Sequence, residues 1–211
     1  GLNKYATVAD YYAKEGTESS LKFTSYKGDG STEGNLIVIG KQSTKNNDIH
    51  GTLAYNGWDA AIGGSDSNDR VYGLEFAGGT ILAVATAKDQ CTAIGGGGNG
   101  YTQMKITGGK VTAIAYTTGT AIGGGIGHKS QGGQSNITIT GGEVYAYNLG
   151  QPYKYTMDVY APYNPEDQSG AVEFVPGTAI GSGSSYWSSG HSSNISITGG
   201  KVYAYSNGGS G

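Results

Sequence analysis

The sequence predicts an all-β fold, a right-handed parallel β-helix with three short strands per turn. The prediction depends on a repeat of about thirty residues and on three strand-like runs within each copy of it. One copy cannot bury its apolar side alone, so successive copies have to stack on one another. The crossover helices of an ordinary parallel sheet do not fit into a repeat that already carries three strands.

Four copies of the repeat align, and their first runs share the pattern Ala-Ile-Gly-Gly or a close variant. These first runs lie at residues 59–64, 91–96, 119–124 and 177–182. A second run follows a variable loop and ends in a glycine pair, as in residues 136–142 (Asn-Ile-Thr-Ile-Thr-Gly-Gly). A third run, such as residues 144–147, comes directly after the pair. The glycine pairs are expected at corners, where the backbone turns sharply.

Alternation along the runs separates buried from exposed positions, because successive side chains of a strand point to opposite faces. In the second run, Ile137, Ile139 and their counterparts are expected to point inward. In the third run, the inward positions are those of Val144 and Ala146. We therefore expect a core built of columns of aliphatic side chains.

The chain is expected to form an N-terminal cap over residues 1–34 and a β-helix over residues 35–211, with a long insertion at residues 148–176. A cap is expected because the open end of a β-helix exposes strand edges that invite aggregation. Residues 5–16 have the pattern of a short capping helix that starts near Thr7 and closes at a glycine. Residues 35–40 are expected to form the second run of an incomplete copy.

The composition excludes several classes of protein. The chain has 40 Gly but only 4 Pro, whereas collagen needs glycine at every third position and abundant proline. A net charge of −3 and a single arginine, Arg70, argue against a nucleic-acid partner. No apolar run reaches the roughly 20 residues of a membrane span, so no membrane insertion is expected. Residues 208–211 lie where a further copy would begin, and further domains of the same polypeptide are expected.

The Ala-Ile-Gly-Gly-Gly elements at residues 93–97 and 121–125, with the Ile-Thr-Ile-Thr-Gly-Gly-x-Val element at residues 137–144, carry a resemblance. They resemble the Gly-rich repeats of large cell-surface proteins of Gram-positive anaerobes. They are similar, less closely, to the carbohydrate-binding β-helix proteins of cellulolytic clostridia. The resemblance covers residues 59–205 and rests on corner and core residues. It implies a secreted or surface-anchored protein, with polysaccharide binding as its expected function.

Tyrosines occupy the outward positions of the last two third runs: Tyr145, Tyr147, Tyr203 and Tyr205. Adjacent turns are about 5 Å apart, so the four rings would form a flat aromatic stripe. Tyrosine combines an apolar ring with a polar hydroxyl, which suits both the C–H surfaces and the hydroxyls of sugars. The alternative is that the insertion folds over the stripe and makes it a second small core.

The insertion and one variable loop carry further aromatic candidates. The insertion contributes Tyr153, Tyr155, Tyr160 and Tyr163, and the loop after residues 177–182 contributes Tyr186 and Trp187. Long loops on a rigid scaffold are common places for binding residues, and an exposed tryptophan usually has a partner. The insertion is therefore expected to be a binding loop, with a plain cover for the stripe as the alternative.

No catalytic residues are expected, and the chain is not expected to be an enzyme. Hydrolases on this fold need paired carboxylates on neighbouring turns, and Glu75 is alone among the outward strand positions. Asp66 and Asp69 are candidate calcium ligands, because oxygen-bearing side chains alternate in residues 66–69. An ordinary polar turn is the alternative for this segment. No other metal or cofactor is expected.

Taken together, these features predict a non-catalytic module, extracellular or on the cell surface, that binds a polysaccharide or surface glycan through aromatic side chains. One alternative is a structural or adhesin spacer within a larger surface protein, whose aromatic residues are merely packed. Another is a polysaccharide lyase or glycoside hydrolase. Solvent exposure of the tyrosine stripe separates the binding module from the spacer.

Overall fold

The computed structural model describes residues 21–24, 34–40, 60–64, 71–86, 92–97, 100–116, 119–125, 133–150, 153–156, 171–174, 177–183 and 193–207. These residues form two parallel sheets and one antiparallel strand pair, so the all-β prediction is confirmed. The helix predicted over residues 5–16 lies outside the described residues. No helix with the length and apolar character needed to cross a membrane occurs in the described part.

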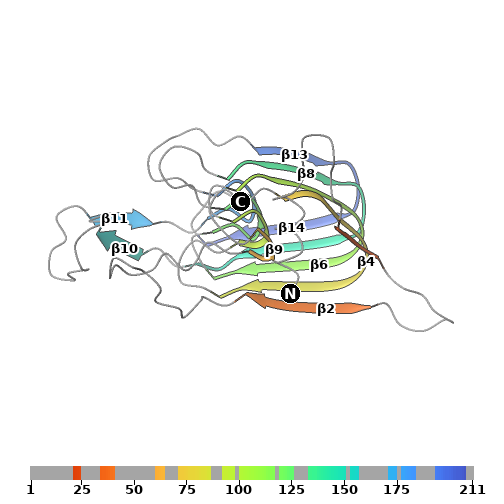
Figure 1. Cartoon of the computed structure of the whole chain (residues 1–211), viewed down its shortest axis with the longest axis horizontal. Coiled ribbons are helices and arrows are strands. Elements are labelled where there is room, and N and C mark those ends of the chain that lie inside the picture. Colours follow the sequence, from red (N-terminus) through yellow and green to blue (C-terminus); the bar gives the residue numbers. More distant parts are fainter. Residues whose placement is uncertain are drawn as a thin grey trace.

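The larger sheet contains eight strands that all pair in parallel. They are β1 (Leu21–Phe23), β2 (Asn35–Gly40), β4 (Val71–Ala85), β6 (Thr102–Ala115), β8 (Ser135–Ile139), β9 (Glu143–Asn148), β13 (Ser193–Ile197) and β14 (Lys201–Ser206). The second runs of the repeat pair in the order β1-β4-β6-β8-β13, and the third runs pair in the order β2-β4-β6-β9-β14. β4 and β6 belong to both rows, because each bends through its glycine pair as one continuous strand (Figure 1).

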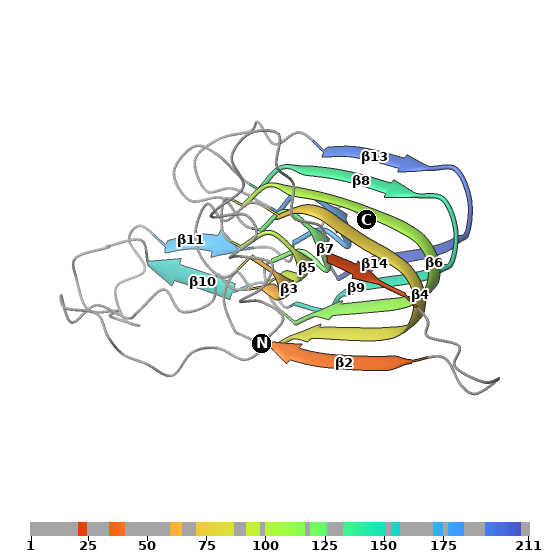
Figure 2. The same cartoon turned by 45° about the vertical axis from the view of Figure 1, so that its right-hand side comes forward.

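The first runs form the smaller sheet, which has the order β12-β7-β5-β3. Its strands are β3 (Ala60–Gly63), β5 (Thr92–Gly95), β7 (Ile122–Gly123) and β12 (Ile180–Gly181), all paired in parallel. Within the insertion, β10 (Tyr153–Thr156) and β11 (Ala171–Phe174) pair antiparallel. Figure 2 shows this pair apart from the two parallel sheets.

The register of the strands aligns the inward positions of successive copies into columns. Met104 pairs with Ile137, which pairs with Ile195, and Val111 pairs with Val144, which pairs with Val202. In the interior copies these side chains are almost completely buried, in one cluster that also contains the isoleucines of the smaller sheet. The predicted columns of aliphatic side chains are therefore confirmed for the described copies.

Two glycine positions explain why the corners of the repeat are so constant. Gly95 has a φ of 139°, and a Cβ atom there would collide with the carbonyl oxygen of Gly123 in the next copy. Gly142 has a φ of 81°, and a Cβ atom there would lie 2.7 Å from the carbonyl oxygen of Gly109. Positive φ and the close approach of neighbouring backbones both require glycine, so the glycines recur in each copy.

The N-terminal strands differ from their expected places in the repeat. Residues 35–40 were predicted to be a second run, but β2 pairs with residues 80–85 and is therefore a third run. The second run of this copy is β1, which lies within the segment expected to form the cap. The rings of Phe23 on β1 and Phe76 on β4 stack with centroids 4.9 Å apart. The prediction was wrong because second and third runs share the same alternation, and no glycine pair separates β1 from β2.

Candidate binding face

The third strands carry the four predicted tyrosines to one surface. β9 and β14 pair with Tyr145 opposite Tyr203 and Tyr147 opposite Tyr205. The intervening residues Val144 and Ala146 are buried, so alternation turns the tyrosines outward. Tyr203 and Tyr205 are 49% and 51% exposed, and Tyr145 and Tyr147 are half-buried. These four residues therefore lie together on the molecular surface.

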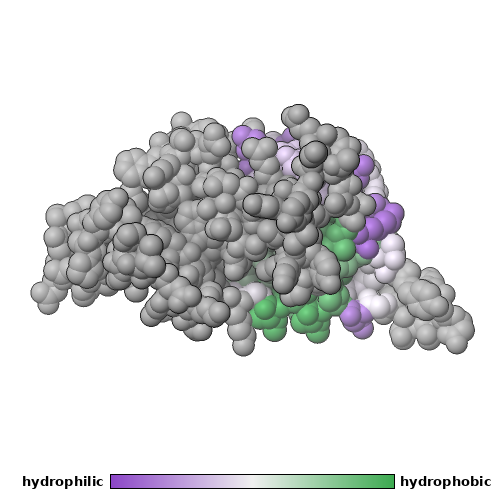
Figure 3. Space-filling view, in the orientation of Figure 1, coloured by the Kyte–Doolittle hydropathy of each residue, from purple (hydrophilic) through white to green (hydrophobic). Residues whose placement is uncertain are grey.

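The same surface continues across the third strands of the earlier copies. We call it the outer face, and it consists of Ile37, Ile39, Leu82, Val84, Thr112, Ile114, Tyr116, Tyr145, Tyr147, Tyr203 and Tyr205. Ile37 and Ile39 on β2 are 66% and 55% exposed. Figure 3 shows hydrophobic side chains gathered at this edge of the molecule, over β2. The outer face is therefore aliphatic at its N-terminal end and aromatic at its C-terminal end.

The tyrosine rings stand on edge rather than lying flat on the sheet. The rings of Tyr145 and Tyr203 are stacked, with centroids 4.9 Å apart and planes 7° from parallel. On the other side of β9, the Nζ atom of Lys110 lies 5.2 Å from the centroid of the Tyr145 ring. Tyr145 thus has neighbours against both ring faces and presents an edge and its hydroxyl. Tyr203 lies on the last described strand, so no further described strand covers its second ring face.

A row of charged residues borders the tyrosines where the third strands begin. Lys110, Glu143 and Lys201 pair in register on β6, β9 and β14. The Nζ atom of Lys201 lies 3.2 Å from Oε1 of Glu143, and the Tyr145 hydroxyl donates to Oε2 of Glu143 over 3.4 Å. The Tyr145 hydroxyl is therefore next to groups that can donate and accept hydrogen bonds.

These contacts shift the pKa values of three side chains. The hydrogen bond from Lys201 and then its charge lower the pKa of Glu143, and the same pair raises the pKa of Lys201. Partial burial, followed by the charge of Glu143, raises the pKa of Tyr145 above its ordinary value. These directions keep Glu143 a carboxylate, Lys201 an ammonium group and the Tyr145 hydroxyl protonated at neutral pH.

Polar side chains fix the ends of the two tyrosine-bearing strands. The Nδ2 group of Asn148 donates to the carbonyl oxygen of Gly119, and Oγ of Ser206 donates to the carbonyl oxygen of Gly177 over 2.8 Å. Both bonds join the end of a third run to the start of the first run in the same copy, and both span 29 positions. Asn148 is fully buried, in register with the alanine at the end of β6. These bonds hold the backbone next to Tyr147 and Tyr205.

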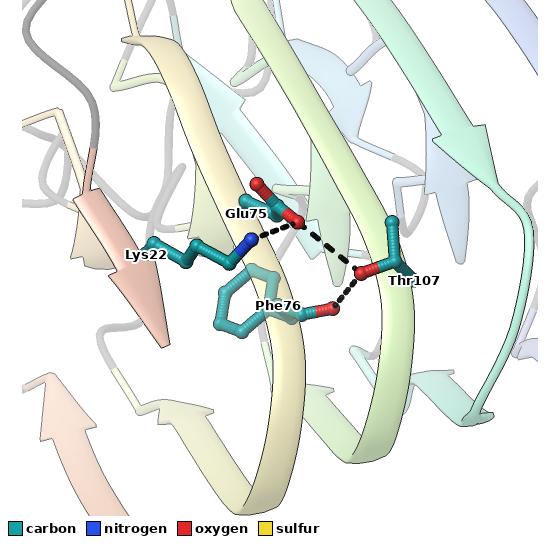
Figure 4. Close-up of polar contacts among 4 residues, drawn as sticks. All are labelled: Lys22, Glu75, Phe76 and Thr107. Atoms are coloured by element: carbon teal, nitrogen blue, oxygen red, sulfur yellow. Dashed lines mark hydrogen bonds and ion pairs between the residues drawn. The ribbon is translucent and has the colours of Figure 1, made fainter. Parts of the chain in front are cut away.

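Glu75, the outward carboxylate singled out in the sequence, serves as a contact between strands. Its Oε1 atom lies 2.8 Å from Nζ of Lys22 and accepts a hydrogen bond from Oγ1 of Thr107 over 3.3 Å (Figure 4). The hydrogen bond from Lys22 is the largest cause that lowers the pKa of Glu75. Glu75 lies in the row of second runs and Glu143 lies in the row of third runs. The two carboxylates are therefore in different rows of the sheet.

The remaining predicted site residues divide into two groups. Tyr153 and Tyr155 lie on β10, paired with Phe174 and Val172 of β11. Residues 66 and 69, the two aspartates predicted to bind calcium, and the aromatic residues at positions 160, 163, 186 and 187 lie outside the described residues. In the described part of the chain, no group of three His, Cys, Asp or Glu side chains is placed to hold a metal ion.

Sequence reasoning missed the charged row and Tyr116. The signal for the row was present, since Lys110, Glu143 and Lys201 each directly precede the first valine of a third run. Tyr116 is exposed and continues the alternation of Thr112 and Ile114, one residue beyond β6.

Comparisons with protein-family models, curated proteins and solved structures found no match to this chain.

Proposed function

We propose that the chain is a right-handed parallel β-helix whose outer face binds a polysaccharide outside the cell. The observation that carries the proposal is the exposure of Tyr203 and Tyr205 beside Tyr145 and Tyr147 on adjacent strands. Large exposed aromatic groups are uncommon on a protein surface without a partner. Their position on a regular sheet fixes their spacing.

Three features support the β-helix. The three runs of each copy pair with the matching runs of the next copy, and the core cluster draws on both parallel sheets. The bonds from Asn148 to Gly119 and from Ser206 to Gly177 link the start and the end of a single copy. Parallel strands joined through a crossover connect with a right-handed turn in nearly all proteins, which favours the right-handed form.

The chemistry of the outer face suits a sugar polymer. Strands in a sheet repeat at roughly 4.8 Å, so successive tyrosines form a regular row along which a linear chain can lie. The hydroxyls of Tyr145 and Tyr147 can donate and accept hydrogen bonds, supplemented by Glu143 and Lys201. Tyr203 offers a ring face for the C–H surface of a sugar. Binding needs no catalytic group, and we propose a non-catalytic module.

A polysaccharide array tests the proposal. The full chain is incubated with plant, mucin and bacterial polysaccharides, and retention is compared with that of the Tyr203→Ala/Tyr205→Ala variant. Tyr101→Ala is the matched control, because it removes a tyrosine whose ring contacts Tyr72 on the row of second runs, away from the outer face. Retention that is lost in the double variant and kept in the control supports the proposal. If no polysaccharide on the array retains wild type or the control, the proposal is contradicted.

The aliphatic end of the outer face favours a second candidate function. Exposed Ile37 and Ile39 have no hydrogen-bonding atoms in their side chains and suit a protein surface better than a sugar. This feature favours a structural or adhesin segment that packs against another protein. If the chain binds none of the polysaccharides on the array, the result favours this second candidate. Release of shortened sugar products from the array would instead indicate a lyase or hydrolase.

A further inference from the structure

The last described copy of the repeat exposes side chains that are buried in the interior copies. Ile195 and Ile197 on β13 are 39% and 52% exposed, whereas their register partners Ile137 and Ile139 are fully buried. On β14, Val202 is half-buried and Ala204 is exposed, whereas Val144 and Ala146 are fully buried. The backbone edges of β13 and β14 pair with no further described strand.

The opposite end of the sheet exposes the same columns. Leu21 and Phe23 on β1 and Leu36 and Val38 on β2 pack against the core but remain partly exposed. Through the register, Leu21 belongs to the column of Ile195, and Phe23 belongs to the column of Ile197. Leu36 and Val38 belong to the columns that end at Val202 and Ala204.

We infer that the strand edge formed by β13 and β14 receives β1 and β2 of a second copy of this chain, so that molecules join head to tail. The contact repeats, between two molecules, the parallel pairing that joins each copy of the repeat to the next within one molecule. In the continued register, Ile37 and Ile39 of the second copy would lie beside Tyr203 and Tyr205, so the second ring face of Tyr203 stays open only at the end of a row. The contact does not depend on the binding of a polysaccharide.

Side-chain size and shape favour this occupant. Within one molecule, Val38 already packs in register with an alanine, Ala83, and Ala204 would offer it a second alanine. Phe23 has one ring face against Phe76, which leaves the other face for Ile197. An unpaired parallel edge with apolar side chains is a ready template for a further strand.

Charge also favours the contact. In the continued register, Lys22 would lie beside Ser196, and Lys201 would lie beside Asn35, so no like charges meet among the described residues of these strands. Each lysine keeps its own carboxylate, Lys22 with Glu75 and Lys201 with Glu143. Because the two joined edges are different, the contact is heterologous and generates rows rather than closed pairs.

The first test measures the mean mass of the full chain by sedimentation over a concentration series. We expect the mean mass to rise with concentration for wild type and to stay at the monomer value for Ile197→Lys. The charge of this variant lies at a half-exposed site of the monomer, so its melting temperature should stay near that of wild type; Ile195→Lys is a second variant with the same expectation. Thr198→Lys places the same charge on the next, exposed residue and should assemble like wild type.

Wild type that stays monomeric at every concentration would overturn the inference, as would assembly of both isoleucine variants. A mixing experiment tests the head-to-tail order. Ile197→Lys keeps an intact β1 and β2 edge, so it can still join the β13 and β14 edge of a wild-type molecule. Its own β13 edge accepts no further molecule, so it should stop the growth of a row. Adding it to wild type should therefore lower the mean mass. An equal amount of Thr198→Lys should not lower it. A mean mass that Ile197→Lys leaves unchanged would also overturn the inference.

Discussion

The ring of Tyr145 lies between Lys110 on one side and Tyr203 on the other, and its hydroxyl donates to Glu143. This arrangement assigns different tasks to two tyrosines that look equivalent in the sequence. Tyr145 supplies a ring edge and a hydroxyl whose orientation is fixed by its neighbours. Tyr203 supplies a ring face at the end of the described row.

Ile139 and Ile197 lie in register, but their alanine variants should lose very different amounts of unfolding free energy. Ile139→Ala removes a fully buried side chain and should lower the free energy of unfolding by about 2–5 kcal/mol. Ile197→Ala removes a side chain that is half exposed in the monomer and should cost less than about 1 kcal/mol. Urea unfolding at low protein concentration measures both. Equal losses would contradict the assignment of β13 to the open end of the sheet.

Alanine should destabilise the fold much more at a corner glycine than at a glycine with open space around it. Gly142→Ala forces a side chain into a positive-φ position with the Gly109 carbonyl oxygen 2.7 Å away, and should destabilise the chain by more than about 1 kcal/mol. Gly34→Ala is the control, since among the described residues beyond its chain neighbours no atom lies within 4 Å of its new Cβ. Thermal unfolding compares the two variants, and similar melting temperatures would count against the corner geometry.

The ion pair between Lys201 and Glu143 predicts a pH dependence. The folded chain lowers the pKa of Glu143 below 4.5, so the unfolded chain takes up this proton first as the pH falls. The pair therefore stabilises the fold above the unfolded pKa, and its contribution is lost as the pH falls through the folded pKa.

NMR titration of the Glu143 carboxyl carbon measures this shift. Lys201→Gln should move the pKa of Glu143 back toward 4.5, because it removes the largest cause of the lowering. Lys105→Gln should leave the titration unchanged, since the charge of Lys105 acts on Glu75 instead. An unchanged pKa in Lys201→Gln would show that the contact does not persist in solution.

Alternation and repetition were sufficient to predict the sheet faces. Ile137 and Ile139 inward and Tyr145 and Tyr203 outward follow from a period of two residues, which any parallel stack has to respect. The place of β2 did not follow, because alternation is the same in second and third runs. Only the pairing with residues 80–85 distinguishes them.

The candidate site was predictable in position but not in geometry. Register places Tyr145 opposite Tyr203, yet it does not determine the side-chain torsions that stack the rings on edge. Those torsions depend on contacts with Lys110 and Glu143, which a pattern of aromatic residues alone does not reveal. The sequence does carry a signal for both residues, since each directly precedes the first valine of a third run.

The proposed function requires the outer face to bind a polysaccharide through Tyr203. Isothermal titration calorimetry with a polysaccharide retained on the array tests it most directly, in wild type, Tyr203→Ala and Tyr101→Ala. Loss of a stacking ring should weaken binding about tenfold, equivalent to roughly 1.4 kcal/mol, whereas Tyr101→Ala should stay within about twofold of wild type. Wild-type affinity in Tyr203→Ala, with its fold intact, would contradict a role for Tyr203 in binding.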